Sequence, residues 1–413
     1  MSLQTFFIMF DKPNAVYVAG ETVSGKIVLQ LGQEKKVRGL LLSVRGESRV
    51  HWTESRTVRD SKGHNTTRHD TYTNSEKYFN FEFSIVGSSR SDSRTIIAAG
   101  YYEYPFRFEL PYNIPSSFEH QYGHVRYTVK AVIDRPWKFD HETKRAFTVV
   151  ATLDLNDCRA QCLGINDDIH NEFYNCCCCC SNGSMDVQVQ LPVSGYVPGQ
   201  TINTWCSYNN CSSSVQITKI CVKLMRLISF YSSSPSSKVK RESNEIKSTT
   251  YSGPFTNRGE AVMDILVPPI PPSNLQFCNI IDLKYTLAVV VHVSGLHQKI
   301  VKDYVILIGT TPLYIEQGPS AMPMPTLRPS APLDDQKARA SSSSTDHPIG
   351  FVPPAEPSTS NNWNIPPPSY EECVSKADNI KDSDESSYVI GANDPFAPRY
   401  PVFNYPAPSI HGR

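Results

Sequence analysis

An internal repeat is the feature that most constrains how this chain can fold. Residues 17–22 read Tyr-Val-Ala-Gly-Glu-Thr, and residues 196–201 read Tyr-Val-Pro-Gly-Gln-Thr, 179 positions later. Two further pairs follow in the same order, residues 37–44 with 217–224 and residues 125–129 with 283–287. Three ordered correspondences with a change of offset between them indicate two copies of one folding unit.

The repeated unit reads as all-β. Short runs rich in Val, Ile, Tyr and Phe recur between turn signals, and residues 26–30 and 104–108 alternate with the period of two that a half-buried strand requires. No long stretch shows an uninterrupted helical period. Many short strands at this spacing favour an antiparallel sandwich over a parallel α/β sheet. We therefore expect tandem, immunoglobulin-like antiparallel β-sandwich domains.

Proline usage separates a body from a tail. Of the 31 prolines, 17 fall in residues 318–413, a composition that predicts a disordered segment. The expected organisation is a sandwich over 1–153, a Cys-rich connection over 154–184, a second sandwich over 185–315, and a disordered Pro/Ser-rich tail over 316–413.

Charge and hydropathy exclude some classes of function. Lys plus Arg and Asp plus Glu are both 40, because a body with 33 basic and 29 acidic residues balances a tail with 7 and 11. A chain without a basic excess does not predict nucleic-acid binding. The first ten residues lack a basic region before an apolar run, and no window of 18 apolar residues occurs. We expect a cytoplasmic protein whose cysteines are reduced thiols or metal ligands.

The sequence resembles the α-arrestins, or arrestin-domain-containing proteins. The resemblance rests on the Tyr-x-x-Gly-x-x-Val-x-Gly-Lys-Ile pattern from residue 17, on Tyr-Pro-Phe-x-Phe from residue 104, on residues 125–137, and on the second turn at 196–201. It implies two arrestin-type sandwiches hinged around residues 152–185. It also implies a non-enzymatic adaptor that links membrane cargo to ubiquitin ligases.

The tail contains a PPxY sequence formed by Pro367, Pro368 and Tyr370. Successive prolines preset the polyproline II backbone, so little entropy is lost when they dock into the aromatic groove of a WW domain. The tyrosine ring fills a second pocket. These three residues predict recruitment of a WW-domain ubiquitin ligase, of HECT type in view of the resemblance.

Two weaker motifs lie in the same tail. Pro398 and Tyr400 have only one of the two prolines, and coincidence explains them better than a second WW ligand supplying avidity. The second motif matches the P-[ST]-A-P late-domain pattern, which binds the UEV domain of ESCRT-I in extended form. It consists of Pro329, Ser330, Ala331 and Pro332.

Cysteines cluster between the two expected sandwiches. Residues 176–180 are all Cys, and Cys158 and Cys162 have a spacing typical of zinc ligands. A zinc site would combine them with two of the run, such as Cys176 and Cys179. S-acylation and a plain Cys-rich connection are the alternatives. No other cofactor is indicated.

An enzymatic function is not predicted. The chain has no P-loop, G-x-G-x-x-G, G-x-S-x-G or H-E-x-x-H sequence, and His51, His64 and His69 fall in a polar segment that reads as a loop.

The sequence therefore predicts a trafficking adaptor, peripheral to plasma membrane and endosomes, that binds cytoplasmic regions of membrane receptors or transporters. It would promote their ubiquitination, endocytosis and endosomal sorting. A retromer-type structural subunit and a zinc or redox protein centred on the cysteines are the alternatives.

Overall fold

The computed structural model describes most of the body and part of the tail. The described residues are 3–59, 64–87, 95–174, 181–314, 369–372, 375–382, 385–386 and 388–404. The chain divides into one compact unit made of residues 1–313 and 366–413 and a second unit made of residues 314–365.

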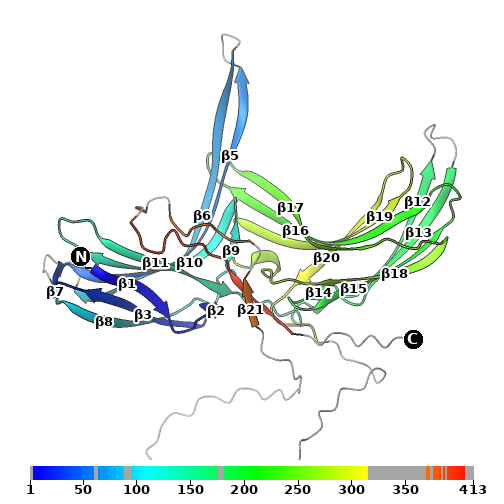
Figure 1. The fold of residues 1–413 in the computed structure, drawn as a ribbon. Helices are drawn as coiled ribbons and strands as arrows, with labels where there is room; N and C mark the ends of the chain where they lie inside the picture. The colour runs from blue at the N-terminus through cyan, green and yellow to red at the C-terminus, as the bar shows by residue number, and fades with distance from the viewer. Residues whose placement is uncertain are drawn as a thin grey trace, which may run out of the picture. The chain divides into compact units, whose positions relative to one another are not determined.

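The first half of the chain forms a β-sandwich (Figure 1). One sheet has the order β1-β3-β8, with bounds Leu3–Phe10, Thr22–Leu31 and Gly100–Glu109. The other has the order β2-β11-β10-β5-β6, with bounds Val16–Val18, His141–Val150, Gly123–Asp134, Gly39–Arg59 and Asn65–Gly87. Short strands complete it: β9 (Phe118–His120) pairs with β10, and β4 (Lys35–Val37) pairs with β7 (Thr95–Ile97).

Alternation along the strands builds the core between these sheets. In β3, Val23, Ile27 and Leu29 are fully buried, whereas Lys26 and Gln30 on either side of the Ile27–Leu29 segment are partly exposed; Val28 within it is buried as well. Burying one such aliphatic side chain contributes about 1.5–3 kcal/mol. The period of two seen in the sequence is therefore the pattern that fixes which face of the strand turns inward.

The second half forms another sandwich. Its sheets have the orders β12-β13-β15-β18 and β14-β20-β19-β16-β17. The bounds of the first sheet are Ile165–Tyr174, Ser181–Leu191, Thr201–Asn210 and Arg258–Leu266. Those of the second are Gly195–Tyr196, Ile300–Ile308, Ile281–Val293, Ile217–Ser232 and Lys238–Tyr251. The short 3-10 helices η1 (Arg159–Gln161) and η2 (Ser273–Leu275) precede β12 and β19. The described residues are thus nearly all-β, as the sequence predicts.

The expected inter-domain connection over 154–184 contains an edge strand of the second sandwich. Strand β12 pairs with β13 from Ile165↔Leu191 to Tyr174↔Ser181. Its exposed face carries alternating polar residues, and only Phe173 is buried, so its apolar signal is weak. The second sandwich therefore begins about twenty residues before the expected boundary at 185.

Equivalent interactions confirm the repeat. Tyr127 of β10 donates its hydroxyl hydrogen bond to the carbonyl of Pro115 at 2.6 Å, and Tyr285 of β19 donates to Pro271 at 2.8 Å. Strand β2 pairs in parallel with β11, and β14 pairs in parallel with β20 in the same way. The two sandwiches share both the strand plan and a buried tyrosine that fixes the proline-rich bend beside it.

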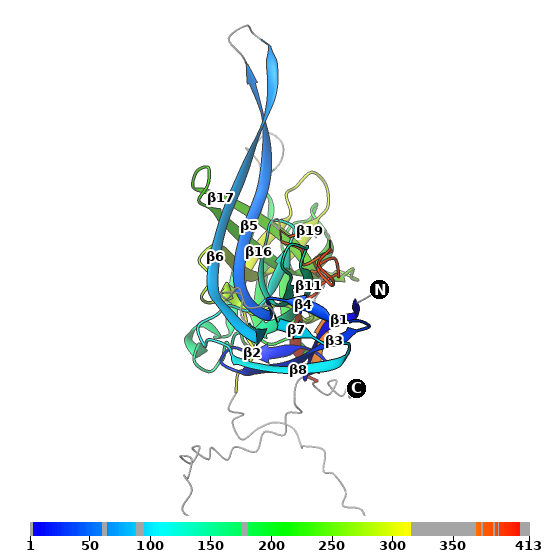
Figure 2. The same ribbon diagram turned by 90° about the vertical axis from the view of Figure 1, so that its left-hand side faces the viewer.

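Strands β5 and β6 form a long hairpin that extends beyond the sheet (Figure 2). Their pairing continues to Arg59↔Asn65, through the polar segment that was expected to be a loop. Beyond Trp52 both faces of β5 are largely exposed, so no apolar alternation marks the strand in the sequence. His69 contacts the Ser55 hydroxyl at 2.8 Å on the opposite strand.

The hairpin and β9 connect the two sandwiches. The Thr73 amide donates to the Ser234 carbonyl at 2.8 Å, and the Asn279 amide donates to Glu76 at 3.0 Å. The ring of His120 stacks on Phe230 with centroids 5.0 Å apart. Burial, with Arg226 as a second cause, lowers the pKa of His120 to about 4.

Acidification should therefore weaken the fold in part through His120. Its folded pKa lies below the ordinary value of 6.5, so the unfolded chain binds the proton more readily and stability falls as the pH drops from about 6.5 to 4. Because the Glu242 carboxylate lies 3.5 Å from His120 Nε2 and favours its protonated form, we expect His120→Phe to remove only about 1 kcal/mol of the loss between about pH 7 and pH 5. Denaturant unfolding of both proteins at the two pH values measures this. An unchanged pH dependence in the variant would contradict it.

The tail departs from the expectation of a wholly disordered segment. Residues 375–382, 385–386 and 388–404 contact mainly the first sandwich, and Ser375 and Phe403 contact the second. These residues carry buried apolar side chains, namely Ile380, Val389, Ala392, Tyr400, Val402 and Phe403. The strands β21 (Ser369–Glu372) and β22 (Arg399–Val402) pair with each other. The tail has few apolar side chains, but these are enough for docking because they pack against the surface of the sandwich.

Candidate functional site: the docked tail

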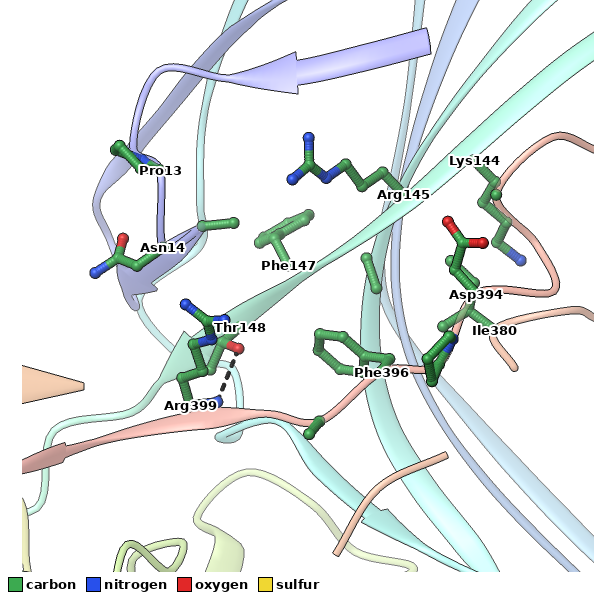
Figure 3. Close-up of a pocket in the computed structure, with 15 residues that line it drawn as sticks. Pro13, Asn14, Lys144, Arg145, Phe147, Thr148, Ile380, Asp394, Phe396 and Arg399 are labelled. Atoms are coloured by element: carbon green, nitrogen blue, oxygen red, sulfur yellow. Dashed lines mark hydrogen bonds between the residues drawn. The ribbon is translucent and has the colours of Figure 1, made fainter. Parts of the chain in front are cut away.

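Strand β22 anchors the tail in the first sandwich. Tyr400 is 1% exposed, and its hydroxyl donates to the Ser117 carbonyl at 2.5 Å. The neighbouring Arg399 amide donates to the Thr148 hydroxyl at 3.1 Å (Figure 3). In this arrangement the Tyr400 ring is enclosed by the chain itself, so a WW domain could reach it only after β22 leaves the sandwich. Its role as a second ligand remains a prediction.

The tyrosine of the PPxY sequence lies on β21. Tyr370 faces Pro401 in the antiparallel pair β21–β22 and is half-buried. Burial, followed by the charge of Glu21, raises the pKa of Tyr370. Pro367 and Pro368 lie outside the described residues. The structure thus places the aromatic part of the predicted ligand against a strand of the same tail.

An ion-pair cluster holds the middle of the tail. The Lys144 ammonium of β11 lies 2.7 Å from Asp382 and 3.0 Å from Glu385, and Lys130 of β10 lies 3.2 Å from Glu385. Burial alone would raise the pKa of Asp382, but Lys144, with Arg49 and Arg45, lowers it below its ordinary value. The carboxylate is therefore charged at neutral pH and attracts the basic strands.

Backbone pairing continues the attachment beside this cluster. The Lys144 amide donates to the Ile390 carbonyl at 2.9 Å, and the Ile390 amide donates to Glu142 at 2.9 Å. Gly391 follows with φ of 81°, and a Cβ there would lie 2.4 Å from the Lys144 carbonyl oxygen. Only glycine satisfies both the left-handed backbone and this close approach.

A cavity of about 280 Å³ lies between the tail and the sandwich (Figure 3). Arg145 and Phe147 line it from β11, and Asp394 and Phe396 line it from the tail. The Arg145 guanidinium lies over the Phe10 ring, 5.5 Å from its centroid. The lining thus combines charged and aromatic groups from both the sandwich and the tail.

Sequence reasoning missed the ion-pair cluster. Lys144 stands between Thr143 and Arg145 in a polar stretch, like an ordinary exposed charge on a strand, and Asp382 and Glu385 belong to a polar run typical of a linker. The signal that could have found them is the apolar Tyr-Val-Ile run at 388–390, directly after the acidic residues.

The other predicted sites are only partly described. Cys162 is buried beside η1, and burial, with Cys158 as a second cause, raises the pKa of its thiol. Cys176 and Cys179 lie outside the described residues, as do the four residues of the late-domain motif, Pro329, Ser330, Ala331 and Pro332. No group of three or more potential metal ligands occurs in the described part of the chain. The zinc site and the ESCRT-I motif stay predictions.

Two antiparallel sandwiches in tandem, with a C-terminal segment bound to the first, define a two-domain β-sandwich binding protein. The N-terminal domain of arrestin (or S-antigen) matches residues 6–156, and the arrestin C-terminal domain matches residues 181–313. The chain belongs to the arrestin family.

Its relatives are named as arrestin-domain-containing proteins. The chain is 27% identical to arrestin domain-containing protein 17 of Caenorhabditis elegans, over 98% of this chain and 99% of the relative. It is 27% identical to arrestin domain-containing protein 4 of Mus musculus, over 73% and 70% of the two chains. Thioredoxin-interacting protein of Homo sapiens is 26% identical over 75% of each. This kinship is consistent with an α-arrestin that acts as a non-enzymatic adaptor. Within the described residues, no helix has the length and hydropathy of a membrane span.

Proposed function

We propose that this protein is a trafficking adaptor that recruits a WW-domain ubiquitin ligase of HECT type to membrane-protein cargo. The observation that carries the proposal is a PPxY sequence, Pro367, Pro368 and Tyr370, in the tail of a chain with both arrestin domains. The sandwiches would bind cytoplasmic regions of receptors or transporters, and the tail would bring the ligase. Cargo ubiquitination, endocytosis and endosomal sorting follow, at plasma membrane and endosomes.

The docked tail adds a condition to this function. A WW domain binds PPxY in polyproline II form, with the tyrosine ring in a pocket. Tyr370 instead lies in an antiparallel pair and is half-buried. The ligase must therefore compete with β22 for this segment. The late-domain motif at Pro329–Ser330–Ala331–Pro332 would add ESCRT-I as a second partner of the same tail.

Replacing Tyr370 by alanine tests the proposal. We expect capture of the full chain by immobilised WW domains of a HECT-type ligase to fall roughly 30-fold, because an anchoring tyrosine contributes about 2 kcal/mol. Tyr388→Ala is the matched control, since this tyrosine is exposed on the same tail without adjacent prolines. Equal capture of the Tyr370→Ala variant and the original chain would overturn the assignment.

A further inference from the structure

The turn between β10 and β11 exposes two large aromatic side chains. Trp137 is 95% exposed and Phe139 is 93% exposed, whereas Trp52 in the core is 2% exposed. Burial of large apolar groups is the dominant stabilising term in folding, so two adjacent aromatic rings left in water indicate a surface that meets something else.

The turn is ordered by its own hydrogen bonds. The Arg135 amide donates to the Asp140 carboxylate at 2.8 Å, and the Arg135 guanidinium donates to the Phe139 carbonyl. Trp137 has φ of 62°, a left-handed conformation that is rare for a bulky residue. A backbone held in this way supports two rings that no side chain of the described residues covers.

Basic residues lie on this turn and on the neighbouring strand β4. Lys138 lies between the two aromatic residues, and strand β4 lies beside the turn through the Arg38–Asp134 ion pair at 2.6 Å and the contact of Lys35 with His141 at 3.2 Å. Lys36 of β4 is exposed opposite Ile96 of β7, which is also exposed. Of the nearby acids, Asp134 is paired with Arg38, Asp140 accepts the Arg135 amide, and Glu34 is an exposed carboxylate directly before β4.

The pKa shifts of Lys35 and His141 agree with a positive electrostatic potential at this end of the sandwich. Burial, followed by the charges of Arg135 and Lys138, lowers the pKa of Lys35. Burial, followed by the charges of Arg135 and Lys35, lowers the pKa of His141 to about 4. Cations close enough to disfavour one another's protonation are close enough to act together on an external anion.

We propose that this end of the first sandwich binds an anionic phospholipid surface, with Trp137 and Phe139 entering the headgroup region and Lys36 and Lys138 pairing with the lipid charges. Trp is favoured at the membrane–water interface, and a basic residue near an anionic surface contributes about 1 kcal/mol. Protein partners are usually met by aromatic anchors within a packed patch, whereas here the rings stand on a narrow turn among cations. That geometry suits a fluid, negatively charged surface.

This inference deepens the proposed function, on which it rests for the expectation that the protein works at a membrane. The lipid contact itself needs no WW domain and no residue of the tail. The proposed lipid binding and the proposed ligase recruitment can therefore be disproved separately.

Vesicle binding of the full chain tests the proposal. We expect cosedimentation with phosphatidylcholine vesicles that contain phosphatidylserine, weak cosedimentation with phosphatidylcholine alone, and at least about a tenfold loss for Trp137→Ser combined with Phe139→Ser. Lys36→Glu combined with Lys138→Glu should also lose binding and its salt dependence. Val262→Ser, which changes another exposed apolar residue on β18, should bind normally.

Two further measurements keep the outcomes distinct. Trp137 fluorescence should shift to shorter wavelength on binding, and the shift should weaken in Trp137→Phe, which retains an aromatic ring. Capture by WW domains without vesicles should be the same for all of these variants. The proposal is overturned if the Trp137/Phe139 double variant binds vesicles normally, or if Leu296→Ser, at the exposed turn after β19, removes binding instead.

Discussion

Replacing Lys144 by alanine should release the tail from the first sandwich. The Lys144 side chain is 2% exposed and lies within 3.0 Å of two carboxylates, Asp382 and Glu385, which both belong to the tail. Removing one partner of a buried ion pair costs about 3–5 kcal/mol when the remaining charge is left uncompensated, and less here because Glu385 keeps Lys130 at 3.2 Å and Asp382 keeps Arg45 at 3.6 Å. Here that cost falls on docking, because the tail can leave and take its carboxylates into water. Hydrogen exchange at the Ile390 amide, which donates to Glu142, should therefore accelerate strongly.

A matched control separates tail release from general loss of charge. Lys223 and Glu245 form an ion pair of the same length, 2.7 Å, but both side chains are substantially exposed. Exposed pairs contribute about 0–1 kcal/mol, so Lys223→Ala should leave exchange in the tail unchanged. Capture by WW domains should rise with Lys144→Ala, since Tyr370 loses its partner strand when β22 departs. Unchanged protection at Ile390 in the Lys144 variant would contradict the ion pair's role.

Replacing Arg126 by methionine should give the largest loss of stability. Its guanidinium makes two hydrogen bonds to Glu119, at 2.7 and 2.8 Å, and both side chains are buried. The variant would leave the Glu119 carboxylate without its partner next to the core, so we expect the free energy of unfolding to fall by about 3–5 kcal/mol. Denaturant unfolding followed by fluorescence measures the loss.

A double variant distinguishes lost pairing from lost packing. Arg126→Met combined with Glu119→Leu removes both charges, and apolar replacements of a buried pair are often neutral. We expect most of the stability to return. A double variant as unstable as Arg126→Met alone would show that the shape of these side chains, rather than their pairing, is what matters at β9 and β10.

The fold could be predicted because its signals are local. Alternation in β3 and the repeated turns at Gly20 and Gly199 lie within short stretches of sequence, and both turns have the positive φ that glycine provides. The outer part of the β5–β6 hairpin could not be predicted, because neither of its faces is apolar. Strand β12 was missed for a similar reason, since it is an edge strand with one buried side chain.

The candidate site could be predicted only in part. The PPxY sequence is a contiguous motif, so Tyr370 could be proposed as a WW ligand from the sequence alone, and this role stays a prediction. The strand that pairs with Tyr370 cannot be recognised from its place in the sequence, because β22 begins 27 residues after the end of β21. Strand β22 also docks through a hydrogen bond between Tyr400 and Ser117, which are 283 positions apart. The role of the Lys144 charge is likewise visible only in the folded chain, where it pairs with Asp382, 238 positions later. Contacts between residues so far apart in the chain leave no pattern in the local sequence.

The end of the tail touches both sandwiches, with a thermodynamic consequence. Tyr400 is bonded to Ser117 in the first sandwich, and the Phe403 amide donates to the Pro198 carbonyl in the second at 3.0 Å. At Gly199 a Cβ would lie 1.9 Å from the Phe403 carbonyl oxygen, so the fit is close. The tail therefore forms a non-covalent bridge between the two domains. A ligand that binds better when the two domains are apart would weaken the docking of the tail. By linkage, a ligase that displaces the tail would make the two domains separate more easily, and the coupling free energy is the same in both directions. If cargo and ligase bind as proposed, the affinity of each would therefore depend on whether the other is bound.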